Sequence, residues 1–300
     1  MATHSSEPIK VMIWGPPRSL STVFEKCMSY VDDVQIVNEP YNSAATNVAE
    51  RRELLNQTPL IQDGVDKFKA EAEKMELKGN ITDVGWEQKS CTYAWMKNLL
   101  EGDFPGKKVV FVKDIQGGII DHFNMLPKGY RHTFLIRNPI KMLISLRKLC
   151  MKMFSLSEDQ FSLSTLPAKL RYQYEPITEL MEYVKKNMGE TSPLIIDADD
   201  LQNHPASILR QYCEGLGIPY KDSLLQWPAG DDCVKKNWLV SKFFLQGDQI
   251  LGYYARALAS TKFEASRPVP PENEIPADVL EQAKIEEPFY QKLYELRIKP

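Results

Sequence analysis

Short β-branched runs alternate with longer amphipathic segments along this chain, and the alternation limits the folds open to it. Apolar, strand-like runs lie at 10–14, 34–37, 109–113, 133–136 and 194–196. Segments with apolar residues at helical spacing lie at 19–30, 90–100, 139–151, 168–187 and 205–216. Buried strands that alternate with helices are typical of a parallel sheet covered on both faces. We predict an α/β fold with a doubly wound, mainly parallel β-sheet flanked by helices.

Length and composition are compatible with one large core. The 300 residues, 43% of them apolar, can bury a substantial interior, and we expect 1–300 to form one domain. Segment 46–89 is charged and is predicted to be a helical insertion beside an acceptor pocket. Within 267–300, the proline-rich stretch 267–276 cannot form a helix or a central strand, and is predicted to be a connector to a helix at 277–296.

The charge balance argues against nucleic acid and membrane partners. A net charge of −3 lacks the dense basic field that either surface requires. The first ten residues show no export signal, and we find no apolar run of spanning length. Five scattered cysteines without a C-x-x-C pair indicate reduced thiols, hence a cytoplasmic protein, and make a metal site improbable. The oligomeric state is left open.

A polar loop follows the first predicted strand. Residues 14–22 read WGPPRSLST and precede a helix, so free backbone N–H groups and the positive helix end would face an anion. A Walker A loop needs a second glycine followed by lysine, whereas Leu20, Ser21 and Thr22 stand at those positions. The loop therefore predicts a phosphate site, and it disfavours ATP bound with Mg²⁺.

The side chains of this loop suit a phosphate held without a metal. Arg18 supplies a cation, while Ser19, Ser21 and Thr22 supply hydroxyls. The alternative is that a serine only caps the helix and that Arg18 lies on the surface.

A second anion motif follows the strand at 133–136. Arg137 ends that strand, Pro139 suits the first turn of the next helix, and Ser145 lies about two turns along it. The alternative is an arginine that pairs with a carboxylate and a serine on a polar helix face. Two such motifs at strand ends favour an anion site, because ligands of doubly wound sheets bind beyond the carboxyl ends of the strands.

These motifs resemble those of sulfotransferases that use 3'-phosphoadenosine 5'-phosphosulfate (PAPS), in particular the branch with the sequence P-R-S-x-S-T. The resemblance implies a P-loop-like sulfotransferase fold, PAPS as donor and its product PAP, with no metal. It implies that the 5'-phosphosulfate is held by Arg18, Ser19, Leu20, Ser21 and Thr22. Leu20 replaces the glycine common in relatives. Arg137 and Ser145 match the motif that holds the 3'-phosphate.

Other segments extend the resemblance. Residues 194–219 resemble a family segment that runs from Y-E-D-L to a helix ending in L-G-I-P, and we expect it to be structural. Lys235 and Lys236 precede an aromatic residue in roughly the place where relatives carry an R-K-G loop or a K-x-W segment over the cofactor. A solvated surface is the alternative for these two lysines.

Three residues are candidates for the chemistry. Glu39 follows the second predicted strand in an E-P pair, whose glutamate is the general base in carbohydrate-type sulfotransferases; alternatively it only pairs with Arg18. Lys113 ends the strand at 109–113 and could neutralise the leaving oxygen. Phenol and steroid sulfotransferases use a K-x-H histidine, but Ile115 occupies that position. His122, expected on a following helix, is the second candidate base.

We therefore predict a sulfotransferase that acts on a hydroxyl or amine of a small molecule by in-line displacement. Two alternatives remain. The first is a P-loop kinase or other phosphotransferase, which the fold would accept. The second is a non-catalytic PAP-binding protein, because the K-x-H histidine is absent. The sequence does not identify the acceptor.

Overall fold

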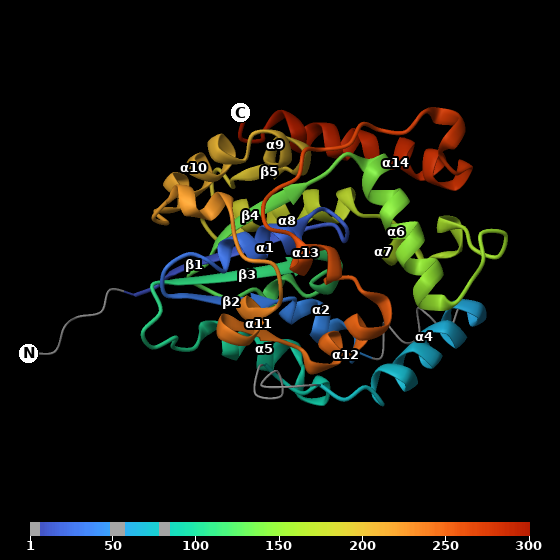
Figure 1. Ribbon diagram of the computed structural model, residues 1–300, viewed down its shortest axis with the longest axis horizontal. Helices are drawn as coiled ribbons and strands as arrows, with labels where there is room; N and C mark the ends of the chain where they lie inside the picture. The colour runs from blue at the N-terminus through green and yellow to red at the C-terminus, as the bar shows by residue number, and fades with distance from the viewer. Residues whose placement is uncertain (1–6, 49–57, 78–84) are drawn as a thin grey trace, which may run out of the picture.

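The computed structural model describes residues 7–48, 58–77 and 85–300 (Figure 1). Within these residues six strands form one sheet in the order β5-β4-β1-β3-β2-β6, and every neighbouring pair is parallel. The strands are β1 (Ile9–Gly15), β2 (Val34–Asn38), β3 (Val109–Ile115), β4 (Arg131–Ile136), β5 (Ile195–Asp197) and β6 (Trp238–Val240). The predicted α/β fold with a doubly wound parallel sheet is confirmed.

Strand β6 was absent from the sequence prediction. It is three residues long and pairs with the end of β2, from Ile36 to Asn38. So short a run carries no recognisable period, and its strand conformation follows from pairing with β2.

Helices occupy both faces of the sheet. The helices that follow the N-terminal strands are α1 (Ser21–Met28), α2 (Pro40–Ala45), α4 (Pro59–Ala72), α5 (Tyr93–Glu101) and α6 (Pro139–Phe154). Next come α7 (Ala168–Arg171), α8 (Tyr174–Asn187), α9 (Ala198–Asn203), α10 (Pro205–Leu216) and α11 (Asp232–Asn237). The chain ends with α12 (Lys242–Leu251), α13 (Ala255–Ala259) and α14 (Ala277–Glu295).

The helix predicted at 168–187 is interrupted. Tyr172 is extended between α7 and α8. Pro176 has no N–H group, so it cannot donate a helical hydrogen bond to the carbonyl oxygen of Tyr172. The carboxylate of Glu286 instead accepts hydrogen bonds of 2.8 Å from the backbone N–H groups of Gln173 and Tyr174. A cap supplied by α14 thus fixes the start of α8.

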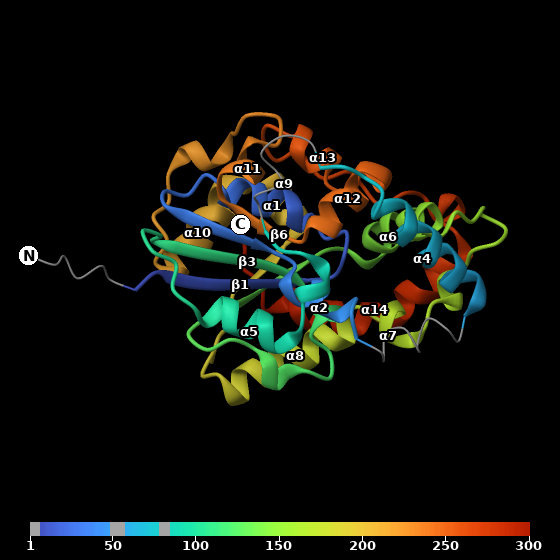
Figure 2. The same cartoon turned by 90° about the horizontal axis from the view of Figure 1, so that it is seen from below.

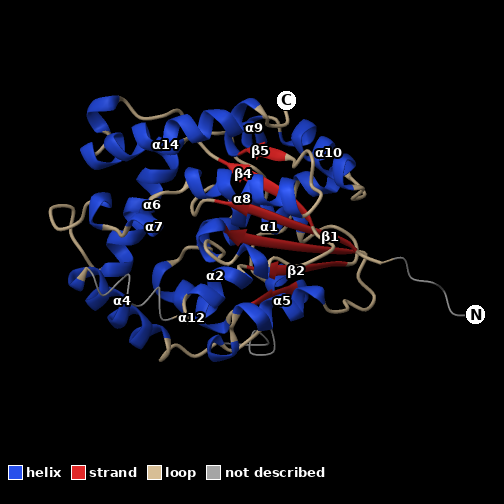
Figure 3. Ribbon diagram, turned by 180° about the vertical axis from the view of Figure 1, so that it is seen from behind, coloured by secondary structure: helices blue, strands red, loops and turns tan. Residues whose placement is uncertain are grey.

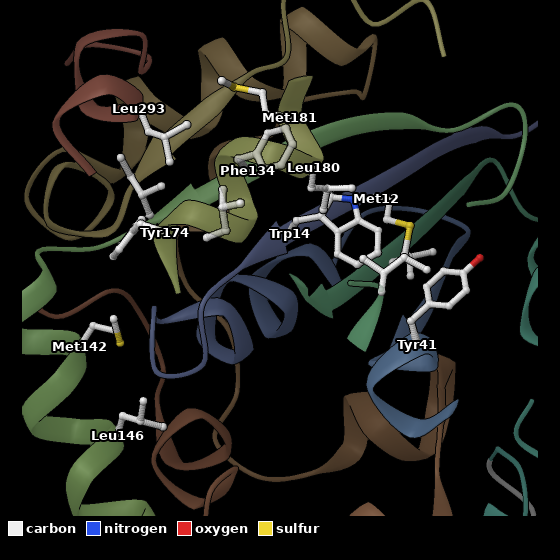
Figure 4. Close-up of a cluster of buried hydrophobic side chains, with 14 of the residues drawn as sticks. Met12, Trp14, Tyr41, Phe134, Met142, Leu146, Tyr174, Leu180, Met181 and Leu293 are labelled. Carbon is white, nitrogen blue, oxygen red and sulfur yellow. The ribbon is translucent and has the colours of Figure 1, made fainter. Parts of the chain in front are cut away.

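Alternation along β1 builds two cores. Met12 and Trp14 pack on one face, where α5, α8 and α14 lie, whereas Val11 and Ile13 pack on the other, against α1 and α10. Figure 2 shows these helices on opposite sides of the strands, and Figure 3 shows the sheet between them from behind. Figure 4 shows the first core around Trp14.

The strand order places a switch point at the centre of the sheet. β1 pairs with β3 on one side and with β4 on the other, so the loops that follow β1 and β4 leave adjacent strand ends. Ligands of such sheets bind at this point. The fold therefore brings together the two motifs that the sequence singled out.

Helix α4 forms an outer wall near this edge. It packs on α6 and α12, and Gly64 allows the close approach, because a Cβ atom there would lie 2.6 Å from the Cα of Phe154. This helix lies within the predicted insertion, whose remaining parts at 49–57 and 78–84 are outside the described residues. Among the described helices we find none with the length and apolarity needed to cross a bilayer.

Candidate active site

A cavity of about 670 Å³ lies at the carboxyl edge of the sheet. Its walls come from the loop after β1, the ends of β2, β3 and β4, and helices α4, α6, α7, α12 and α13. The sequence-predicted residues that line it are Arg18, Leu20, Ser21, Thr22, Glu39, Lys113, Arg137 and Ser145. The two predicted anion motifs and two of the three candidate catalytic residues thus share one cavity.

Hydrogen bonds join the two anion motifs. Arg18 Nε donates to Ser145 Oγ at 3.1 Å, and Arg137 Nη1 donates to the carbonyl oxygen of Arg18 at 2.6 Å. Neither arginine forms an ion pair with a carboxylate in the described part of the chain. The alternative that Arg137 pairs with a carboxylate is therefore not seen there. Two largely buried guanidinium groups without an ion pair are suited to bind an anion.

The surroundings of the two arginines also favour an anion. Burial lowers the pKa of both arginines. The charge of Glu39 opposes this for Arg18 and that of Asp199 for Arg137, whereas the positive charge of Arg256 lowers both pKa values further. The Nε of Arg137 and the Oγ of Ser19 are buried and have no hydrogen-bond partner. An anion bound between the arginines would lower the electrostatic cost of burying them, and it could accept a hydrogen bond from Arg137 Nε.

Arg256 was missed by the sequence analysis. It lies on α13, lines the cavity and forms an exposed ion pair of 3.1 Å with Glu264. It stands alone in its sequence neighbourhood, so no local pattern distinguishes it from a surface arginine. Lys235 and Lys236, which the sequence analysis placed over the cofactor, are exposed on α11 and do not line the cavity. Lys235 pairs with Asp231 at 2.8 Å.

The loop after β1 adopts an unusual backbone conformation. Arg18 and Leu20 have positive φ values of 68° and 74°, and α1 begins at Ser21. A left-handed conformation costs an L-residue roughly 1–2 kcal/mol, and glycine adopts it freely. Glycine would therefore adopt the conformation of Leu20 at lower cost. Ser19 is fully buried and does not line the cavity with its side chain.

Tyr174 fixes the backbone of Arg137. Its buried hydroxyl accepts a hydrogen bond of 3.0 Å from the N–H of Arg137 and donates one to the carbonyl oxygen of the same residue. Since Glu286 caps α8 at Tyr174, helices α8 and α14 together hold the end of β4 in place.

Glu39 and Lys113 form an ion pair where β2 and β3 end. The second carboxylate oxygen of Glu39 accepts a hydrogen bond of 2.7 Å from Asn42 Nδ2. Lys113 is 2% exposed; burial lowers its pKa, but the neighbouring carboxyl groups, Glu39 foremost, outweigh this effect and raise the pKa above its ordinary value. The direction of the shift favours the cationic form of Lys113. Glu39 forms no ion pair with Arg18, although its charge raises the pKa of that arginine.

A second buried carboxyl lies behind this pair. Glu25 on α1 is fully buried, accepts a hydrogen bond of 2.8 Å from Asn38 Nδ2, and leaves its Oε1 atom without a partner. The hydroxyl of Tyr254 donates to Asn38 Oδ1 at 2.8 Å. Burial raises the pKa of Glu25 to about 8, against the opposing charge of Lys113. The sequence analysis did not single out Glu25, which lies on α1 in no motif.

His122 does not line the cavity. Its ring stacks on Tyr93 with the centroids 4.0 Å apart, and it precedes the single turn Phe123–Met125. The helix expected to carry His122 is therefore absent. Within the described residues no group of three or more His, Cys, Asp or Glu side chains could hold a metal ion.

The fold and the cavity define an α/β protein with a phosphate-type loop and a second cationic motif at the switch point of a parallel sheet. A family model described as "Sulfotransferase domain" matches residues 185–294. This match covers the C-terminal part of the chain and agrees with the resemblance stated from the sequence.

Two curated proteins of Arabidopsis thaliana are similar to most of the chain. "Branched-chain-amino-acid aminotransferase-like protein 2" is 31% identical over 72% of this chain and 31% of its own length. "Branched-chain-amino-acid aminotransferase-like protein 1" is 28% identical over 75% of this chain and 33% of its own length. The chain spans about a third of the length of these relatives.

Two solved structures are similar over nearly the whole chain. The "Sulfotransferase Domain from the Curacin Biosynthetic Pathway" has 15% identity and a TM-score of 0.46, and covers 99% of this chain and 100% of its own. The "Sulfotransferase Domain from the Synechococcus PCC 7002 Olefin Synthase" has 18% identity and a TM-score of 0.45, and covers 95% of this chain and 97% of its own.

Proposed function

We propose that this protein transfers the sulfuryl group of PAPS to a hydroxyl or amine of a small acceptor. The observation that carries the proposal is the shared cavity, in which Arg18 and Arg137 form no ion pair with a carboxylate of the described residues and the Glu39–Lys113 pair lies at the neighbouring strand ends. Polyanion binding and proton transfer would then take place in one space.

The residues fit the two phosphates of the donor. The N-terminal end of α1, with Ser21 and Thr22, would hold the 5'-phosphosulfate. Arg137 and Ser145 would hold the 3'-phosphate, and Arg256 lies near enough to both arginines to add its charge. The hydrogen bond from Arg18 to Ser145 links the residues proposed for the 5'-phosphosulfate to those proposed for the 3'-phosphate.

The chemistry requires one base and one cation. Bound PAPS would supply the sulfuryl group and leave as PAP with the electron pair of the broken S–O bond. Glu39 would take the proton of the attacking hydroxyl or amine as the new bond to sulfur forms. Lys113, a buried cation beside it, would stabilise negative charge that develops on the departing bridging oxygen. No metal is required by these roles.

The experiment measures ligand specificity first and turnover second. Thermal unfolding is followed with PAP, with adenosine 5'-monophosphate, and with ATP plus Mg²⁺; PAP should raise the melting temperature most, because a ligand stabilises the state that binds it. Preferential stabilisation by ATP plus Mg²⁺ would support the kinase alternative instead.

Turnover separates the enzyme from a non-catalytic binder. The protein is incubated with PAPS and a metabolite extract, and products that gain the mass of SO₃ are sought by mass spectrometry. Such products, with matching release of PAP, support the proposal. Tight PAP binding without any product would favour the binder.

We also propose that residues 1–300 work as one domain in the cytoplasm, on a small molecule and without a nucleic acid or membrane partner. The support for this comes from the composition: a slightly acidic chain with reduced cysteines.

A further inference from the structure

Lys148 is an exposed lysine that also lines the cavity. It lies on α6 one turn beyond Ser145, about 4.5 Å further along the helix axis. No described residue hydrogen-bonds to it or forms an ion pair with it. The other two lysines on this line of α6 do have partners: Lys141 pairs with Asp199 at 2.6 Å, and Lys152 donates to the carbonyl oxygen of Leu251 at 2.8 Å.

Apolar side chains contribute to the cavity wall on the same helix and on two others. Ile144 and Leu149 line the cavity from α6, and Phe68 and Phe243 line it from α4 and α12, with their rings packed edge to face. These side chains are partly buried, and they offer hydrophobic surface to a ligand. A purely polar acceptor would leave this surface without a partner.

The charges of the cavity are unbalanced. Glu39 is the one carboxylate among its described lining residues, and Lys113 already pairs with it. Lys169, at the α7 side, pairs with Asp121 outside the cavity. The donor phosphates account for the arginines at the switch point, but they do not account for a cation one turn further out among apolar side chains.

We propose that the acceptor is amphipathic: an apolar body that carries a carboxylate or another anionic group, which Lys148 binds. The acceptor hydroxyl or amine would then lie toward Glu39, with the apolar body between α4, α6 and α12. This inference rests on the proposed function, because it assigns the outer part of the same cavity to the acceptor.

The test compares a carboxylate with its methyl ester. Binding of 3-(4-hydroxyphenyl)propanoate and of its methyl ester to the PAP-saturated protein is measured by calorimetry. The carboxylate should bind roughly three- to tenfold more tightly, as expected for one ion pair that is partly exposed. In Lys148→Gln this preference should disappear while the affinity for the ester stays the same; Lys148→Arg should restore it.

Lys152→Gln is the matched control, because it removes the same charge from the same helix at a position that does not line the cavity. It should keep the preference for the carboxylate. Equal binding of both probes by the unmodified protein would overturn the inference. So would a loss of PAP affinity in Lys148→Gln, which would place Lys148 in the donor site.

Failure of the proposed function would be recognised separately. If PAP does not bind at all, the sulfotransferase proposal fails. The carboxylate and ester are then compared on the unliganded protein, where the same Lys148 variants decide whether an anionic amphipathic ligand is recognised.

Discussion

The Nε atom of Arg18 lies 3.1 Å from the hydroxyl of Ser145, and this hydrogen bond joins the loop after β1 to a helix that follows β4. Arg137 adds a second link by donating to the carbonyl oxygen of Arg18 at 2.6 Å. The two anion motifs therefore form one connected cationic surface. The positive charge of Arg18 lowers the pKa of Arg137, so a negatively charged ligand would lower the repulsion between the two groups.

Removal of either guanidinium should weaken PAP binding strongly. Arg18→Ala and Arg137→Ala each lose charge-assisted hydrogen bonds in a buried site, and we expect a loss on the order of 2–3 kcal/mol, or about 30- to 150-fold in affinity. Calorimetric titration with PAP measures this. Arg210→Ala is the control, since Arg210 is exposed on α10 and stacks on Tyr220. A PAP affinity unchanged in both site variants would contradict the assignment of the site.

If Arg137 and Ser145 bind the 3'-phosphate, their removal should weaken the binding of PAP more than the binding of adenosine 5'-monophosphate. Ser145→Ala keeps the helix and removes one hydroxyl. We expect about a threefold to tenfold loss for PAP, and little change for the monophosphate. Equal losses for both nucleotides would mean that Ser145 does not contact the 3'-phosphate.

The sequence predicted the sheet because parallel strands that are buried on both faces are apolar along their length, as in β1 and β3. It also placed Arg18 and Arg137 at one edge of the sheet, because residues that follow parallel strands meet there, and both line one cavity. Both predictions depend on local patterns, which a single sequence contains.

The remaining features depend on contacts between distant segments. Arg256 reaches the cavity because α13 packs against α1, and nothing near it in sequence indicates this. The strand β6 exists through pairing with β2. The turn that replaces the helix expected around His122 places this side chain against Tyr93 and not in the cavity. Such outcomes are set by tertiary packing, which a local pattern does not record.

Leu20 gives a test of loop geometry. Its φ of 74° is favourable for glycine and poor for a β-branched residue. Leu20→Gly should therefore keep PAP affinity within about threefold, whereas Leu20→Val should lower both PAP affinity and stability by roughly 1–2 kcal/mol. Calorimetry and thermal unfolding measure the two quantities. If valine is tolerated as well as glycine, the loop does not need the left-handed conformation for binding.

Glu39 should matter for turnover and little for donor binding. Glu39→Gln keeps the shape of the side chain and its contact with Asn42, but it cannot accept a proton. We expect kcat to fall about 10²- to 10⁴-fold with PAP affinity nearly unchanged. His122→Gln is the comparison, because its ring lies against Tyr93 and should leave kcat within about twofold. Equal turnover by Glu39→Gln and the parent protein would remove Glu39 as the base.

Glu25 should make stability depend on pH in one direction. Its pKa of about 8 lies above the ordinary value of 4.5, so the folded protein favours the neutral carboxyl. The resulting stabilisation is complete below about pH 4.5 and is lost as the pH rises through 8, by up to on the order of 4–5 kcal/mol. Asp114, also raised to about 8, acts in the same direction.

Glu25→Gln keeps an acceptor for Asn38 and has no proton to lose. The variant should therefore lose less stability than the parent protein between pH 5.5 and pH 9, so that its relative stability increases with pH. Thermal unfolding of both proteins without ligand, at matched ionic strength, measures this difference. Glu214→Gln, which changes an exposed carboxyl on α10, should leave the dependence as it is. A difference between Glu25→Gln and the parent that is constant with pH would mean that Glu25 is ionised in the folded protein throughout this range.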